Sequence, residues 1–124
     1  MSEYIAPLRD MQFALKELAG LEQVAQLPGC EEATPDLVDA VLEEAAKFAE
    51  GVLSPLNWSG DQEGARWHDK AVTMPAGFKE AYKLFADSGW TALAAESEWG
   101  GQGLPKVVSA AVNEMWKSAN HSFS

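Results

Sequence analysis

The sequence contains little cysteine, little histidine and few basic residues. A single cysteine, Cys30, excludes both an internal disulfide and a metal site built from cysteines. The two histidines, His68 and His121, lie far apart, and neither belongs to a helical ligand pair such as His-Glu-x-x-His. We interpret each histidine as a surface or partly buried polar residue and expect no metal site.

Basic charge is scarce as well. Nine Lys and Arg residues face 19 Asp and Glu residues, which gives a formal net charge of −10. Such a surface repels phosphate backbones and anionic lipids, so a nucleic-acid partner is not expected. No stretch reaches the roughly 18 apolar residues of a membrane span. Charged residues at Glu3, Arg9 and Asp10 interrupt any signal peptide, so we expect a soluble cytoplasmic protein.

Strand signals are sparse, and internal repeats and low-complexity segments are lacking, whereas apolar residues recur at helical spacing. The chain has 124 residues, of which 47% are hydrophobic, enough for about one folded domain. The periodicity predicts an all-α fold, with a bundle of about four helices around one core and an N-terminal helical arm.

Residues 1–33 are expected to form this arm. Pro7 can start a short helix, and Gly20 is a plausible stop. Residues 27–30, Leu-Pro-Gly-Cys, have the composition of a turn. We expect the arm to pack against the domain that follows it.

The clearest helix is predicted from residue 35 to about residue 54. Thr34 is suited to the N-cap and Pro35 to the first helical position. Pro55 disfavours the α conformation of the preceding residue, so the helix should end or kink there. We assign residues 34–124 to the helical domain that begins with this element.

Residues 57–72 have turn chemistry and predict a long connection, which Trp67 and Val72 could attach to the core. Pro75 is then expected to open another helix, and Gly89 to end it.

A glycine-dense loop precedes the last predicted helix, whose apolar stripe runs from Leu104 to Ala119. Gly100, Gly101 and Gly103 invite comparison with a phosphate-binding loop. The spacing is not Gly-x-Gly-x-x-Gly, no strand precedes it and no Lys-Ser/Thr pair follows, so a tight turn is the better interpretation. Beyond Ala119 no glycine cap follows, which indicates a chain cut from a longer protein.

Four carboxylates in the first long helix could form acid–base or metal pairs. They fall on its polar face, however, and metal sites in helical bundles need inward-pointing acids. We interpret them as solvent-facing: Asp39, Glu43, Glu44 and Glu50. Composition and spacing therefore predict an acidic helical domain without naming a function.

An ordered set of motifs resembles the N-terminal α-helical domain of acyl-CoA dehydrogenases over about residues 34–124. The set comprises Lys47-Phe48-Ala49-Glu50 followed by Pro55, Asp61-Gln62-Glu63-Gly64, Gly89-Trp90, and Glu98-Trp99-Gly100-Gly101-Gln102-Gly103-Leu104 before a helix with Glu114-Met115. The arm segment from Tyr4 to Met11 resembles the extension of the longer bacterial members, including those that act on 3-methylthiopropanoyl-CoA.

The resemblance implies a parent enzyme with three domains, in which the other two hold FAD together with an adjacent subunit. A glutamate of the C-terminal domain removes the α-proton of the acyl-CoA while hydride passes to the flavin. By this resemblance the partners are the middle and C-terminal domains, the acyl-CoA and a second copy of the enzyme. No residue here is nominated as catalytic, and FAD is not expected on this chain alone.

The resemblance also places Asn120, Phe123 and Ser124 at the start of the wall of the acyl-chain slot. It gives Gly100, Gly101 and Gly103 a geometric role, because residues without side chains let the backbone pass close to a neighbouring domain. The alternative hypothesis is a stand-alone helical module that binds other proteins and performs no catalysis.

Overall fold

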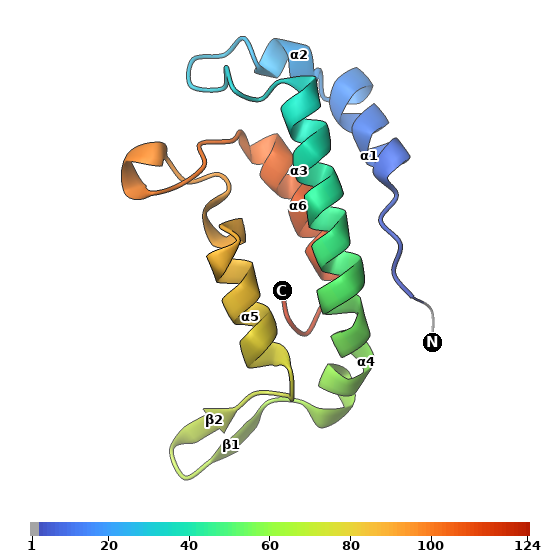
Figure 1. Cartoon of the computed structure of the whole chain (residues 1–124), viewed down its shortest axis with the longest axis vertical. Helices are drawn as coiled ribbons and strands as arrows, with labels where there is room; N and C mark the ends of the chain where they lie inside the picture. The colour runs from blue at the N-terminus through green and yellow to red at the C-terminus, as the bar shows by residue number, and fades with distance from the viewer. Residues whose placement is uncertain (1–2) are drawn as a thin grey trace.

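The longest element of the protein is a nearly continuous helical rod. The computed structural model describes residues 3–124. In it, α3 (Pro35–Phe48) passes through a π-helical turn, η2 (Ala49–Leu53), into α4 (Ser54–Glu63) (Figure 1). The predicted cap is confirmed, because the Leu37 N–H donates to the Thr34 Oγ1 at 3.3 Å and Pro35 occupies the first position.

The prediction that this helix ends near residue 54 is wrong. In α-helical register, the Pro55 ring would clash with the carbonyl of Gly51, four residues earlier. The π-helical turn lies at this point of the chain and changes the hydrogen-bond register there. The rod therefore continues past Pro55 to Glu63, although the proline donates no hydrogen bond.

The prediction of an irregular connection from residue 57 onward is also wrong for its first half, which is helical. Gly60, read from the sequence as a turn residue, is buried in α4. A Cβ atom at this position would collide with the Phe78 ring. The glycine therefore allows α4 to approach Phe78 closely.

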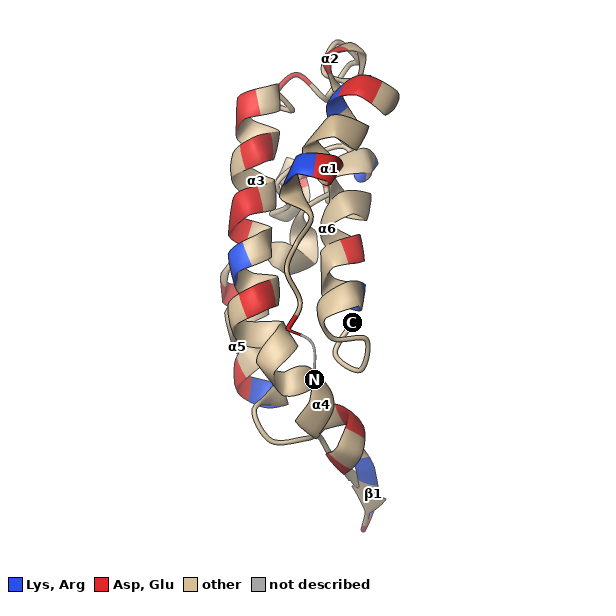
Figure 2. Ribbon diagram, turned by 90° about the vertical axis from the view of Figure 1, so that its right-hand side faces the viewer, with Lys and Arg blue, Asp and Glu red and all other residues tan. Residues whose placement is uncertain are grey.

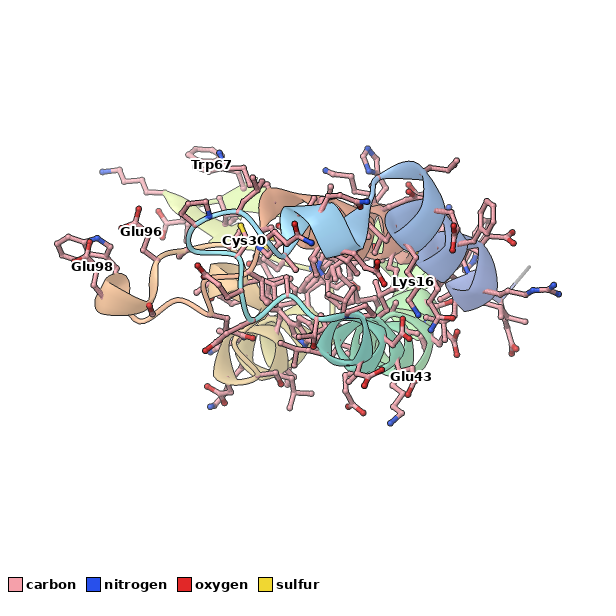
Figure 3. The ribbon with its side chains drawn as sticks, turned by 90° about the horizontal axis from the view of Figure 1, so that it is seen from above. Lys16, Cys30, Glu43, Trp67, Glu96 and Glu98 are labelled. Carbon is pink, nitrogen blue, oxygen red and sulfur yellow. The ribbon has the colours of Figure 1, made fainter. Side chains whose placement is uncertain are left out.

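The second half of that connection forms a hairpin that the sequence analysis missed. β1 (Arg66–His68) pairs antiparallel with β2 (Ala71–Thr73), and Trp67 lies opposite Val72. Asp69 and Lys70 both have positive φ, as a tight two-residue hairpin turn requires. Trp67 and Val72 are 72% and 63% exposed, so the prediction that they attach to the core is wrong. The hairpin extends beyond the end of the helices, and Trp67 projects outward (Figures 1 and 3).

Helix α5 (Phe78–Asp87) follows the hairpin and runs back along the bundle (Figure 1). It begins three residues later than predicted, because Pro75 and Gly77 form a turn in which the Phe78 N–H donates to the Pro75 carbonyl at 3.2 Å. Its predicted end is confirmed: Gly89 has a φ of 82°, which favours glycine.

Helix α6 (Lys106–Ala119) runs in the same direction as α3 (Figure 1) and lies to one side of both α3 and α5 (Figure 2). Its predicted apolar stripe supplies much of the core, and the bundle confirms the all-α expectation. The buried residues of α6 are Val108, Val112, Met115, Trp116 and Ala119.

The N-terminal arm comprises α1 (Leu8–Phe13), the π-helical turn η1 (Ala14–Leu18) and the short α2 (Leu21–Val24). It lies on the side of α3 opposite α5 (Figure 1). Met11, Leu15 and Leu21 are buried in the same core as α3 and α6, so the arm packs on the bundle as expected.

Polar contacts also hold the arm, and they revise the interpretation of the rod's acids. The Ala6 N–H donates to Glu50 Oε1 at 2.9 Å, and Lys16 Nζ lies 2.6 Å from Asp39 Oδ2. Of the four acids interpreted as solvent-facing, Glu43, Glu44 and Glu50 are exposed as predicted, although Glu50 also accepts a hydrogen bond from the arm, whereas Asp39 is partly buried beneath Lys16. Acidic residues recur along α3 (Figure 2), and Glu43 points away from the body (Figure 3).

Candidate functional site

An apolar groove lies where the hairpin, the base of α5 and the C-terminal turn meet. Its volume is about 560 Å³. Its only charged side chain is that of Lys79, so the groove suits an apolar chain better than acid–base chemistry. The lining residues are Val72, Thr73, Met74, Pro75, Phe78, Lys79, Tyr82 and Phe123.

The Phe123 ring is held in the groove by two aromatic neighbours on α5. Its centroid lies 5.9 Å from that of Phe78 and 5.7 Å from that of Phe85, and both pairs have edge-to-face geometry. Phe78 is 3% exposed and packs over Gly60 of α4. The glycine that sequence reasoning assigned to a turn thus supports the floor of the groove.

The C-terminal turn brings the three predicted pocket residues into different environments. Phe123 lines the groove, Ser124 is exposed, and Asn120 is fully buried at 0% exposure. Asn120 Nδ2 donates to the Leu53 carbonyl at 3.0 Å, and its Oδ1 accepts from the Phe123 N–H at 3.1 Å. Their role in an acyl pocket stays a prediction.

The glycine loop uses its backbone amides internally. The Gly101 N–H donates to the Glu96 carbonyl at 3.0 Å, and the Gly103 N–H to the Ala95 carbonyl at 2.9 Å. A Cβ atom on Gly101 would collide with the Ala95 backbone. A phosphate cradle needs N–H groups directed at the ligand, so this geometry agrees with a tight turn.

A more polar groove of about 970 Å³ lies beneath residues 3–5 of the arm. There burial first, and then the charges of Glu114 and Glu50, raise the pKa of the Tyr4 phenol. Across residues 3–124, no group of three or more His, Cys, Asp or Glu side chains is placed to hold a metal ion. In the same range, no helix is both long enough and apolar enough to cross a membrane.

Sequence reasoning missed most of the groove, because one wall is the unpredicted hairpin and the turn after it. A signal was present in the β-branched pair Val72-Thr73, which lies across the two-residue turn from Trp67. The predicted helix between Pro75 and Gly89 supplies two further lining residues, the buried Phe78 and Tyr82, which is 60% exposed.

Comparison with known proteins identifies related sequences along nearly the whole chain. No protein-family model matches it. It is 44% identical over 120 residues to the 3-methylmercaptopropionyl-CoA dehydrogenase of Ruegeria pomeroyi, a match that covers 97% of this chain and 20% of that protein. It is 27% identical over 122 residues to the broad-specificity linear acyl-CoA dehydrogenase FadE5 of Mycobacterium tuberculosis, again with 97% and 20% coverage.

The chain thus spans about a fifth of the length of the curated relatives that it matches. Its helical fold agrees with the all-α domain that the sequence motifs predicted, and the resemblance stated from those motifs is confirmed. The chain is a homologue of the N-terminal helical part of acyl-CoA dehydrogenases.

Proposed function

We propose that this chain is the N-terminal domain of an FAD-dependent acyl-CoA dehydrogenase, an enzyme that introduces an α,β double bond into acyl-CoA thioesters. The observation that carries the proposal is 44% identity across 97% of the chain to a dehydrogenase of this kind. Residues 34–124 would form the domain and residues 1–33 its arm, within a cytoplasmic, homo-oligomeric parent enzyme.

The contribution of this domain to the reaction is to shape the site. The aromatic and aliphatic lining of the groove favours an alkyl chain over water. In the proposed enzyme, Phe123 and its neighbours would wall the acyl chain, while Asn120 and Ser124 lie in the same turn. A short thioester, as in the name of the 44% relative, is the substrate class that we favour.

The redox chemistry is assigned to the remainder of the parent enzyme. FAD, when bound, supplies the acceptor for the hydride from the substrate's β-carbon. The residues of this chain do not fit the flavin pyrophosphate, because the glycine-loop amides bond within the loop and the formal net charge is −10. No chemical step is therefore derived from this chain alone.

The coding DNA downstream of Ser124 provides the first test. We expect an open reading frame for the middle and C-terminal domains, and the extended protein should purify with bound flavin. A stop codon at this point, with no flavoprotein domain following it, would contradict the proposal.

The hairpin favours a second candidate function, that of a stand-alone helical module that binds other proteins. Trp67, Val72 and Met74 are exposed large hydrophobic residues close together in sequence, as in a protein-binding surface. The association state of the isolated chain, measured by light scattering, helps to distinguish the two functions. A stand-alone module should be a stable monomer or a defined oligomer by itself. A domain that lacks its partner domains should self-associate through this surface.

A further inference from the structure

Within residues 3–124, Asn120 is the one polar side chain that is buried in the core. Both ends of its side-chain amide are hydrogen-bonded. Burial of an amide without partners would cost free energy, so its two bonds define its orientation. Nδ2 reaches the carbonyl of Leu53, which lies 67 residues earlier in the chain. One side chain therefore joins the end of α6 to the junction between η2 and α4.

The acceptor end of the same amide determines the path of the last residues. The Phe123 N–H lies 3.1 Å from Asn120 Oδ1 and 3.2 Å from the Asn120 backbone carbonyl. This N–H, shared between the two oxygens of Asn120, closes the turn after α6, and the Phe123 ring lies against Phe78 and Phe85. Asn120 itself is absent from the lining of the groove.

We propose that Asn120 is a positioning residue, which fixes the Phe123 ring through the amide of Phe123 and so sets the shape of the apolar groove. The ring-positioning step follows from the hydrogen bonds and ring contacts alone. Only the identity of the ligand, an acyl thioester, rests on the proposed function. The rival explanation is that Asn120 simply stabilises the end of α6, in which case any core mutation of equal cost would have the same effect.

Three substitutions separate these explanations. Asn120→Leu keeps the branching and the number of side-chain heavy atoms, although its methyl groups are bulkier, and it removes both side-chain hydrogen bonds. Asn120→Ser is too short to reach the Leu53 carbonyl, yet its hydroxyl can accept from the N–H three residues later. Val38→Ala is the control, because it opens a cavity at a buried residue of α3 and alters no hydrogen bond of the C-terminal turn.

The first measurement is nuclear Overhauser contact between the Phe123 ring and the rings of Phe78 and Phe85 in the chain as it stands. We expect these contacts in the wild type, in Val38→Ala and in Asn120→Ser, and their loss in Asn120→Leu. Retention of the contacts in Asn120→Leu would overturn the proposal, as would their loss in Val38→Ala. Should Asn120→Leu fail to fold, Asn120→Ser decides: loss of the contacts in a folded Asn120→Ser protein contradicts positioning through the Phe123 amide.

The second measurement is the binding of the butanoyl thioester of N-acetylcysteamine, a short acyl thioester of the class favoured above, followed by chemical-shift titration. Asn120→Leu and Phe123→Ala should each raise Kd by about tenfold, the loss of a partly buried aromatic contact. The double variant should bind no more weakly than Phe123→Ala. A further tenfold loss in the double variant would show that Asn120 does not act through Phe123.

The outcomes of the two measurements distinguish a failure of the positioning role from a failure of the proposed function. A wild-type chain that binds no thioester while its ring contacts respond as expected would count against the proposed function of the groove and would leave the positioning of Phe123 supported. Thioester binding without any response of the ring contacts would overturn the positioning role and leave the proposed function standing.

Discussion

On one side of the α3–α4 rod lies the N-terminal arm, and on the other lie α5, the hairpin and the groove. The arm buries Met11 and Leu15, and its Ala6 N–H donates to Glu50. The hairpin side leaves Trp67 and Val72 exposed, since the hairpin pairs only with itself. Both sides expose apolar side chains, since Ile5 and Leu18 of the arm are 76% and 77% exposed. The difference is that the arm is anchored in the core by buried residues, whereas all six strand residues of the hairpin are exposed.

The largest effect on the free energy of unfolding is expected from a substitution in the core that both sides of the rod share. Leu42 in α3 is fully buried, and it belongs to the same core cluster as residues of the arm and of α6. Leu42→Ala should lower the free energy of unfolding by about 2–5 kcal/mol, because it removes apolar contacts and leaves a cavity. Urea denaturation followed by circular dichroism measures the change. A loss within experimental error would show that arm and bundle do not share one cooperative core.

A pair of glycine substitutions tests the contact between the rod and the groove. Gly60→Ala should destabilise the protein by about 1–3 kcal/mol, because the new methyl group meets the Phe78 ring. Gly51→Ala is the matched control: a Cβ atom there meets nothing within 4 Å, so helix propensity should make this change neutral or stabilising. Equal effects of the two substitutions on the urea midpoint would contradict the close packing of α4 on Phe78.

A smaller effect is expected at the polar contacts of the arm. Lys16→Met keeps the side-chain length but leaves the partly buried Asp39 carboxylate without its cation. We expect a loss of about 1 kcal/mol, as for a modest ion pair, and faster hydrogen exchange of the arm amides. Lys47→Met, which removes the exposed pair with Glu44, serves as the control and should change neither quantity. Unaltered exchange in Lys16→Met would show that apolar packing alone holds the arm.

The smallest effect on stability is expected at the hairpin tip. Trp67→Ser should change the free energy of unfolding by no more than about 0.5 kcal/mol, since the ring is largely exposed. It should nevertheless reduce self-association in sedimentation experiments, because it removes exposed apolar area. A destabilisation as large as that of Leu42→Ala would mean that the ring packs on the protein, and the contrast between the two sides would be lost.

The helical fold could be predicted from the sequence because apolar spacing and caps act locally. Thr34 and Pro35 start α3 as predicted, and Gly89 follows α5 with the φ expected of a helix stop. The buried stripe of α6 also follows directly from three- and four-residue spacing.

The errors arise where tertiary contacts override local preference. Pro55 and Gly60 both indicate a helix break, yet a π-helical turn accommodates the first and contact with Phe78 requires the second. Asp39 has the spacing of a solvent-facing stripe, but Lys16 of the arm, from a distant part of the sequence, partly covers it. The groove depends on such long-range placement, so only Phe123 was anticipated, and that through resemblance.

The proposal that this chain is the N-terminal domain of an acyl-CoA dehydrogenase is tested most directly by mixing the extended gene product anaerobically with acyl-CoA thioesters of increasing chain length. We expect a purified protein with bound flavin, whose absorption bleaches on mixing as the substrate is converted to the enoyl-CoA. A flavin-containing protein that no acyl-CoA bleaches, or an extended product that binds no flavin at all, would contradict it.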